Sequence, residues 1–253
     1  MPEASPAQLV EAAAASNFDF GGMWVEKDSW TPETTRRVRQ QLGDAGVRLL
    51  DVEVAWIMPG PADPWLCELV DITAALEAKN LLCVSSEPDP DLTRDKFQAM
   101  VDRAEGTGVR VNLEFGLFTE VKTIHQAHAV IEQIDGEAKG VLCDALHWSR
   151  SGGTTEDIAA IPREWIDYAQ LCDAPRAAPD LSDPQAIIDD AINRRMPVGQ
   201  GGLALDGYVD ALPDDIVFAI EERSEDLRNA FPDLNERARE VARTTRTWLD
   251  SRD

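Results

Sequence analysis

The chain has 253 residues, enough for one large globular domain with an extensive buried core. Its formal net charge is −23, from 47 acidic and 24 basic residues, so it lacks the basic surface that a nucleic-acid partner requires and does not suit a DNA-repair nuclease. Hydrophobic residues make up 43% of the chain, yet no apolar run approaches the roughly 18 residues of a membrane span.

The start of the chain and its cysteines indicate a cytoplasmic protein. The segment M-P-E-A-S-P has neither the basic flank nor the apolar centre of a secretory signal peptide. The four cysteines lack the spacing of a metal site, and Cys83 and Cys143 fall inside predicted strands. We therefore expect reduced cysteines in the core.

Helices and short apolar segments alternate along the first hundred residues. Helices are predicted over 6–17, 31–46, 65–79 and 92–105. Apolar segments of strand length fall at 18–25, 47–57 and 81–85. Thr31 is a suitable N-cap for the second helix, and Pro32 follows it in the first turn.

The clearest unit of the chain spans 109–148. Two apolar runs are separated by about 24 residues, room for one crossover helix, which predicts two parallel strands. In the first run the bulky residues at 109, 111, 113 and 115 share one face, so Glu114 lies on the other. In the second run Asp144 ends the apolar segment, and His147 follows three residues later.

The remaining segments continue the same alternation. Strands are predicted over 165–172 and 216–221, and helices over 121–134, 156–161, 185–195, 205–212 and 225–249. A glycine-rich loop at 197–202 is expected at the mouth of the site, with Arg195 able to reach in.

Seven strands can be counted, beginning at 18, 47, 81, 109, 140, 165 and 216. Their tandem order with helices and the even composition predict one α/β domain over residues 1–253, a TIM barrel of the (β/α)8 type. A closed barrel needs eight strands, and no strand can precede the first helix, so the first strand is expected to be absent or replaced by another chain.

Polar side chains at four strand ends are expected to converge inside this barrel. They are Glu114, Asp144, Gln170 and Glu221. Three carboxylates brought together would repel one another and raise each other's pKa, and a divalent cation would remove that cost. Oxygen ligands favour one Mn, Mg or Co ion over zinc.

Several motifs resemble the sugar phosphate isomerase/epimerase family, whose fold is the xylose isomerase-like TIM barrel. They are L-E-F at 113–115, D-A-L-H at 144–147, A-Q-L-C-D-A-P at 169–175, R-x-x-P-x-G-x-G at 194–201 and A-I-E-E at 219–222. The resemblance covers about residues 18–222. It implies a single divalent metal held by Glu114, Asp144, Gln170 and Glu221. Because the third ligand in the sugar epimerases is usually histidine, Gln170 is more similar to the branch that includes 3-dehydroshikimate dehydratases.

The resemblance also implies roles for other residues. His147 would hold a substrate oxygen and Glu114 and Glu221 would serve as base and acid. Arg176 and Glu120 match substrate-binding positions. From their places at predicted strand ends, Trp24 and Trp56 are expected to line the substrate pocket.

The expected activity is isomerisation or epimerisation of a small sugar or polyol ketone, by proton removal α to a carbonyl and a metal-stabilised enediolate. The alternatives are a metal-dependent dehydratase, of the 3-dehydroshikimate or inosose type, and a non-catalytic barrel subunit. The partner is expected to be a small-molecule substrate, without nucleic acid or membrane, and a homodimer is compatible with the resemblance.

Overall fold

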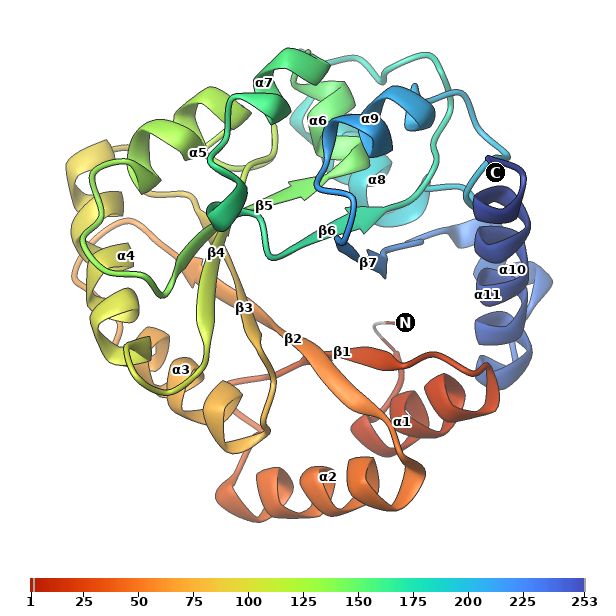
Figure 1. The fold of residues 1–253 in the computed structure, drawn as a ribbon, viewed down its shortest axis with the longest axis horizontal. Coiled ribbons are helices and arrows are strands. Elements are labelled where there is room, and N and C mark those ends of the chain that lie inside the picture. The colour runs from red at the N-terminus through yellow and green to blue at the C-terminus, as the bar shows by residue number, and fades with distance from the viewer. Residues whose placement is uncertain (2, 253) are drawn as a thin grey trace.

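Seven parallel strands form one sheet that curves into a nearly closed barrel (Figure 1). The computed structural model describes residue 1 and residues 3–252. The strands are β1 (Phe20–Trp24), β2 (Arg48–Ile57), β3 (Asn80–Ser85), β4 (Arg110–Glu114), β5 (Lys139–Asp144), β6 (Tyr168–Leu171) and β7 (Val217–Ile220). Each strand pairs with the next along the chain, and no pairing joins β7 to β1 among the described residues. The predicted barrel and its count of seven strands are confirmed.

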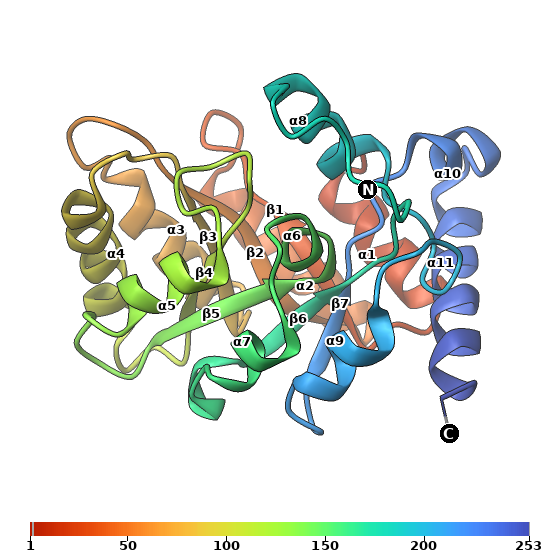
Figure 2. The same ribbon diagram turned by 90° about the horizontal axis from the view of Figure 1, so that it is seen from above.

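The helices surround the barrel, as the view from above also shows (Figure 2). They are α1 (Pro6–Ala15), α2 (Pro32–Ala45), α3 (Trp65–Ala75), α4 (Pro90–Ala104), α5 (Ile124–Ile131), α6 (Ala145–Arg150), α7 (Thr155–Ala159), α8 (Pro184–Asn193), α9 (Leu205–Ala211), α10 (Glu225–Ala230) and α11 (Leu234–Asp250). None of the helices in the described part of the chain has the length and apolarity that crossing a membrane needs.

The gap between β7 and β1 is flanked from outside by the first and last helices. Asn235 of α11 donates a hydrogen bond to Glu11 of α1 at 3.3 Å. Arg246 of α11 donates to the carbonyls of Ser16 and Asn17, at 3.2 and 2.6 Å, just after α1 ends. These contacts hold the two ends of the chain together where an eighth strand would otherwise close the barrel.

The strands separate two apolar layers. The larger one lies between the outer faces of the strands and the helices, and includes Val111 and Leu113 of β4. The smaller one lies inside the barrel and consists of Leu50, Leu82, Val84, Leu142 and Tyr168, with Val217 and Ala219 packed against it. Period-2 alternation therefore places Glu114, two residues beyond Asn112, on the inner side of β4.

The simple alternation of faces breaks within β2. In the sequence Val52, Val54 and Trp56 fall on one side of a regular strand, but Val52 belongs to the outer layer and Val54 packs inside the barrel. The pairing of β2 with β3 shifts between Val52 and Ala55, and this bulge turns the following residues to the opposite faces.

One helix and one strand prediction are also corrected. The long helix predicted over 225–249 is divided into α10 and α11, because Pro232 has no amide hydrogen to donate and Asp233 caps the new helix by accepting from Glu236 N. The strand predicted over 165–172 begins later, as β6, because a 3-10 turn occupies Arg163–Trp165.

Candidate active site

Four polar side chains converge at the carboxyl ends of neighbouring strands. Glu114 and Asp144 are the last residues of β4 and β5, Gln170 lies in β6, and Glu221 directly follows β7. Glu114, Asp144 and Glu221 offer oxygen atoms that all lie within 4.8 Å of one another. Glu114, Asp144 and Gln170 are buried, whereas the side chain of Glu221 is 21% exposed. The four predicted metal ligands are therefore brought together.

A buried arginine bridges two of these carboxylates. Arg195, from the segment that follows α8, lies 2.7 Å from Asp144 Oδ2 through Nη1 and 2.9 Å from Glu221 Oε2 through Nη2. Its Nε donates to the carbonyl of Ala191 at 2.9 Å. This guanidinium balances one of the three negative charges, so the cluster keeps a net charge of −2 when all three carboxyls are ionised.

His147 lies beside the same cluster. Asp144 caps α6 by accepting a hydrogen bond from the His147 amide at 2.9 Å, and this sharp turn brings the imidazole back over the strand ends. The ring Nε2 lies 3.3 Å from Arg195 Nη2, and the ring packs on Phe118 at 5.1 Å between centroids. Burial, helped by Arg195 and opposed by Asp144, lowers the pKa of His147 to about 4, so its imidazole is neutral near pH 7.

The three carboxyl groups differ in their acidity. Burial, and next the charge of Glu221, raises the pKa of Glu114 well above its usual range. Burial also raises the pKa of Glu221, to about 7, against the pull of Arg195. Burial acts on Asp144 in the same direction, but Arg195 and His147 outweigh it, and the pKa of Asp144 lies below its usual value. Asp144 is therefore the carboxyl that stays ionised most readily.

The Gln170 amide can serve the cluster in two orientations. With its nitrogen turned inward, the amide donates to Glu114 Oε1 at 2.7 Å and to Glu221 Oε2 at 3.2 Å. With its oxygen turned inward, it faces only other oxygen atoms. The second orientation is favourable only when a cation lies among these oxygens. A net charge of −2 and an all-oxygen donor set thus fit one divalent metal ion.

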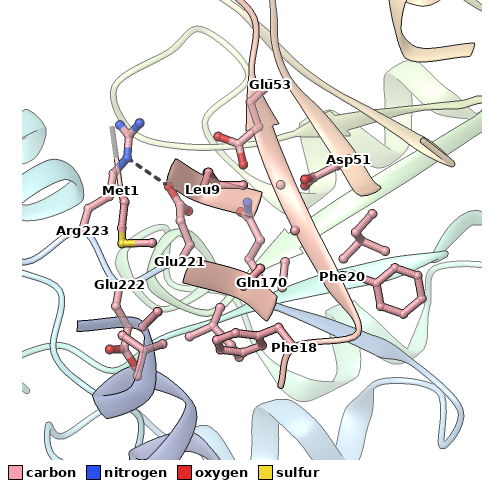
Figure 3. A pocket seen from close by; sticks show the side chains of 18 of the residues that line it. Met1, Leu9, Phe18, Phe20, Asp51, Glu53, Gln170, Glu221, Glu222 and Arg223 are labelled. Atoms are coloured by element: carbon pink, nitrogen blue, oxygen red, sulfur yellow. Dashed lines mark ion pairs between the residues drawn. The ribbon is translucent and has the colours of Figure 1, made fainter. Parts of the chain in front are cut away.

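A cavity of about 220 Å³ extends from this cluster into the gap between β1 and β7 (Figure 3). Gln170 and Glu221 line it, together with Trp24, Glu53 and Arg223. The apolar lining residues include Leu9, Phe18, Phe20, Phe218 and Leu227. The position that lacks an eighth strand is thus the position where small molecules can approach the four converging side chains.

The predicted substrate residues are dispersed. Trp24 lines the cavity and is 37% exposed, while Trp56 is 39% exposed and meets Phe118 edge to face at 6.0 Å. Glu120 is paired with Lys122 at 2.7 Å on the surface.

Arg176 has no ion pair or hydrogen bond with the converging residues within the described chain, and the arginine that does reach them is Arg195. The glycine-rich loop that follows Arg195 was the sequence signal for it. Nothing in the sequence pointed to Phe118, which lies in the loop after β4.

Comparisons with known proteins agree with this architecture. The sequence model of a family described as "Xylose isomerase-like TIM barrel" matches residues 10–251. A 3-dehydroshikimate dehydratase of Pseudomonas aeruginosa is 29% identical over 122 residues, which are 48% of this chain and 18% of that protein. A 3-dehydroshikimate dehydratase of Pseudomonas putida is 24% identical over 215 residues, 80% of this chain and 33% of that protein. The chain thus spans a third or less of the length of these relatives.

Solved structures share the fold. A fusion of a xylose isomerase-like TIM barrel with 4-hydroxyphenylpyruvate dioxygenase superposes with a TM-score of 0.76 at 21% identity, over 94% of this chain and 39% of that one. The IOLI protein, with a zinc atom, superposes with a TM-score of 0.73 at 16% identity, over 96% of this chain and 94% of that one. D-psicose 3-epimerase of Clostridium cellulolyticum H10, with D-tagatose, superposes with a TM-score of 0.67 at 13% identity, over 98% of this chain and 93% of that one.

Proposed function

Because the chain belongs to the xylose isomerase-like TIM barrel family, we propose that it is a divalent-metal-dependent isomerase or epimerase of a small polyhydroxy ketone. The observation that carries the proposal is the convergence of Glu114, Asp144 and Glu221 within 4.8 Å, beside the Gln170 amide. Three carboxylates, two of them buried, rarely converge at one point unless a cation or a proton balances their charge.

The four side chains would hold the ion, and the oxygen donors favour Mn, Mg or Co. When bound, such an ion acts as a Lewis acid that polarises a carbonyl and makes the neighbouring C–H more acidic. The structure of the IOLI protein contains a zinc atom, so zinc is a further ion to test.

The protein's own groups would move the proton. Glu114 and Glu221 approach the same point from β4 and β7, so one can remove a proton from a substrate carbon and the other can return one. The neutral imidazole of His147, held in place by Arg195 and Phe118, can form a hydrogen bond to a substrate oxygen. Return of the proton to the same carbon gives an epimer, and return to the neighbouring carbon gives an isomer.

A second candidate activity is dehydration, which begins with the same proton removal and then loses hydroxide. Two observations favour it: both curated relatives are 3-dehydroshikimate dehydratases, and an amide takes the third ligand position. An inosose is a further substrate for this reaction type.

Exchange of the substrate's α-proton with solvent tests the step that both candidates share. Metal-loaded protein is incubated in D2O with ketohexoses, inososes and 3-dehydroshikimate, and the α-carbon signal is followed by NMR. We expect exchange with at least one substrate, lost in Glu114→Gln and Glu221→Gln but kept in Glu120→Gln, whose carboxylate lies on the surface.

The product then separates the candidates, since an epimer or isomer supports the first and an unsaturated product the second. No exchange with any of these substrates, by protein that binds metal, would contradict both.

A further inference from the structure

A buried aspartate outside the acidic cluster holds the glycine-rich loop. Asp173 follows β6 and is 3% exposed. Its Oδ1 accepts hydrogen bonds from the amides of Ala174 and Leu203, at 2.8 and 3.0 Å, and its Oδ2 accepts from the amide of Gly201 at 2.8 Å. Hydrogen bonds from backbone amides to an ionised carboxylate are among the stronger ones in proteins. The side chain of Asp173 is therefore an anchor for the backbone around it.

The loop packs closely on this anchor. A Cβ atom at Gly201 would lie 2.4 Å from Asp173 Oδ1 and 2.4 Å from the carbonyl oxygen of Ala174, so only glycine allows this approach. Earlier in the same loop, the amide of Val198 donates to Glu222 Oε1 at 3.1 Å. The loop that was expected at the mouth of the site is thus fixed by two carboxyl groups, one after β6 and one after β7.

The same aspartate also fixes the backbone next to Arg195. The Asp173 amide donates to the Met196 carbonyl at 3.0 Å, and the Met196 amide donates to the Asp173 carbonyl at 2.7 Å, which forms an antiparallel bridge. The amide of Arg195 itself donates to the Arg223 carbonyl at 3.1 Å. The backbone of Arg195 is therefore held between the segments that follow β6 and β7.

This backbone position determines what the guanidinium can reach. The Arg195 side chain lies 2.7 Å from Asp144 Oδ2, 2.9 Å from Glu221 Oε2 and 3.3 Å from His147 Nε2. Its Nη1 also lies 3.1 Å from the sulfur of Cys172. A long side chain has many rotamers, so it keeps all of these contacts only if its backbone stays in place. A displacement of about 1 Å is enough to impair a catalytic arrangement.

We propose that Asp173 is a positioning residue that holds Arg195 against Asp144 and Glu221. The inference rests on the proposed function and adds a residue to it. Three carboxylates and one guanidinium give the cluster a net charge of −2, whereas the carboxylates alone give −3. Asp173 would therefore set the charge that a metal ion meets.

Loss of this anchor has two effects of opposite sign. A metal ion binds more tightly, because the positive charge of Arg195 no longer repels it. Proton transfer slows, because His147 loses the arginine that holds its ring. A general defect in folding would instead weaken metal binding together with activity, so the two explanations can be separated.

A double-mutant cycle tests the proposal with Asp173→Asn, Arg195→Met and the double variant. Calorimetry gives the Kd for Mn(II), and NMR in D2O gives the rate of α-proton exchange. The new amide nitrogen of Asp173→Asn faces amide donors, so at least one of the three hydrogen bonds is lost at nearly constant volume. Gly201→Ala displaces the loop and keeps the carboxylate. The matched control is Asp89→Asn, because Asp89 is exposed and accepts from the amide of Asp91 at 2.9 Å.

We expect Asp173→Asn and Arg195→Met each to bind Mn(II) about threefold or more tightly than wild type, and to exchange the α-proton about tenfold or more slowly. Because both changes act through one guanidinium, the double variant should differ from Arg195→Met by less than about twofold in either quantity. Gly201→Ala should change both quantities in the same directions, and Asp89→Asn should change neither.

The inference is overturned if Asp173→Asn and Gly201→Ala leave both quantities at their wild-type values or weaken Mn(II) binding. It is also overturned if Asp173→Asn has the same effect in the Arg195→Met background as in wild type. Failure of the proposed function is recognised separately, by wild-type protein that binds no metal or exchanges no proton. The cycle is then decided by Tm in EDTA, where Asp173→Asn should cause a smaller fall in the Arg195→Met background than in wild type.

Discussion

Replacement of Arg195 by methionine tests how the acidic cluster is balanced. The guanidinium pairs with Asp144 at 2.7 Å and Glu221 at 2.9 Å, so Arg195→Met leaves two carboxylates without their cation. Breaking a buried ion pair from one side costs about 3–5 kcal/mol. Because Glu221 is partly exposed, water offsets some of this loss. We therefore expect the free energy of unfolding to fall by about 3 kcal/mol, the lower end of that range. For a chain of this size that corresponds to a fall in Tm of about 6–12 °C.

The assay is thermal and urea unfolding in EDTA, with Arg103→Met as the control. Arg103 makes two contacts with Asp71 at 2.7 and 2.8 Å, but its side chain is 56% exposed, so its loss should change stability little. Mn(II) at one hundred times its Kd should raise the free energy of unfolding of Arg195→Met by about 2.7 kcal/mol. A destabilisation no larger than that of Arg103→Met would refute the account of Arg195 as the buried counter-ion.

Three further substitutions have defined outcomes. Tyr208→Phe removes a hydroxyl that donates to the Cys143 carbonyl at 2.8 Å, and should lower the free energy of unfolding by about 1 kcal/mol in urea. Gly199→Ala places a Cβ 2.4 Å from the Trp248 ring at a φ of +78°, and should lower Tm, with a loss of about 1–3 kcal/mol from the backbone alone. Burial raises the pKa of Glu222 from 4.5 to about 8, so its protonated form stabilises the fold at low pH, and that stability is lost as the pH rises toward 8. Glu222→Gln should therefore be more stable relative to wild type at pH 9 than at pH 5, and an equal difference at both pH values would contradict this.

The alternation of apolar and polar residues was sufficient to place the carboxylates. In β4 and β7 the bulky residues face the helices, so Glu114 and Glu221 had to face inward, and the parallel order of the strands brought them to the same end. Helix starts were equally readable, since Thr31 caps α2 as expected. These features depend on neighbours a few residues apart.

Features that depend on distant contacts were not readable from the sequence. The bulge in β2 arises from its pairing with β3 and turned Val54 and Trp56 against the simple alternation. The glycine-rich loop pointed to Arg195 near the site, but not to its partner Asp144, which lies 51 residues earlier. Arg176 matched the family spacing and yet lies outside the cluster. The cavity also could not be anticipated, because it depends on where β1 and β7 end up relative to each other.

The most direct test of the proposed metal centre is calorimetric titration of metal-stripped protein with Mn(II). The account predicts one tight site in the wild type, lost in both Glu114→Gln and Glu221→Gln and kept in Glu120→Gln. Folded wild-type protein that binds no Mn(II), Mg(II), Co(II) or Zn(II) would contradict the account and favour a non-catalytic barrel.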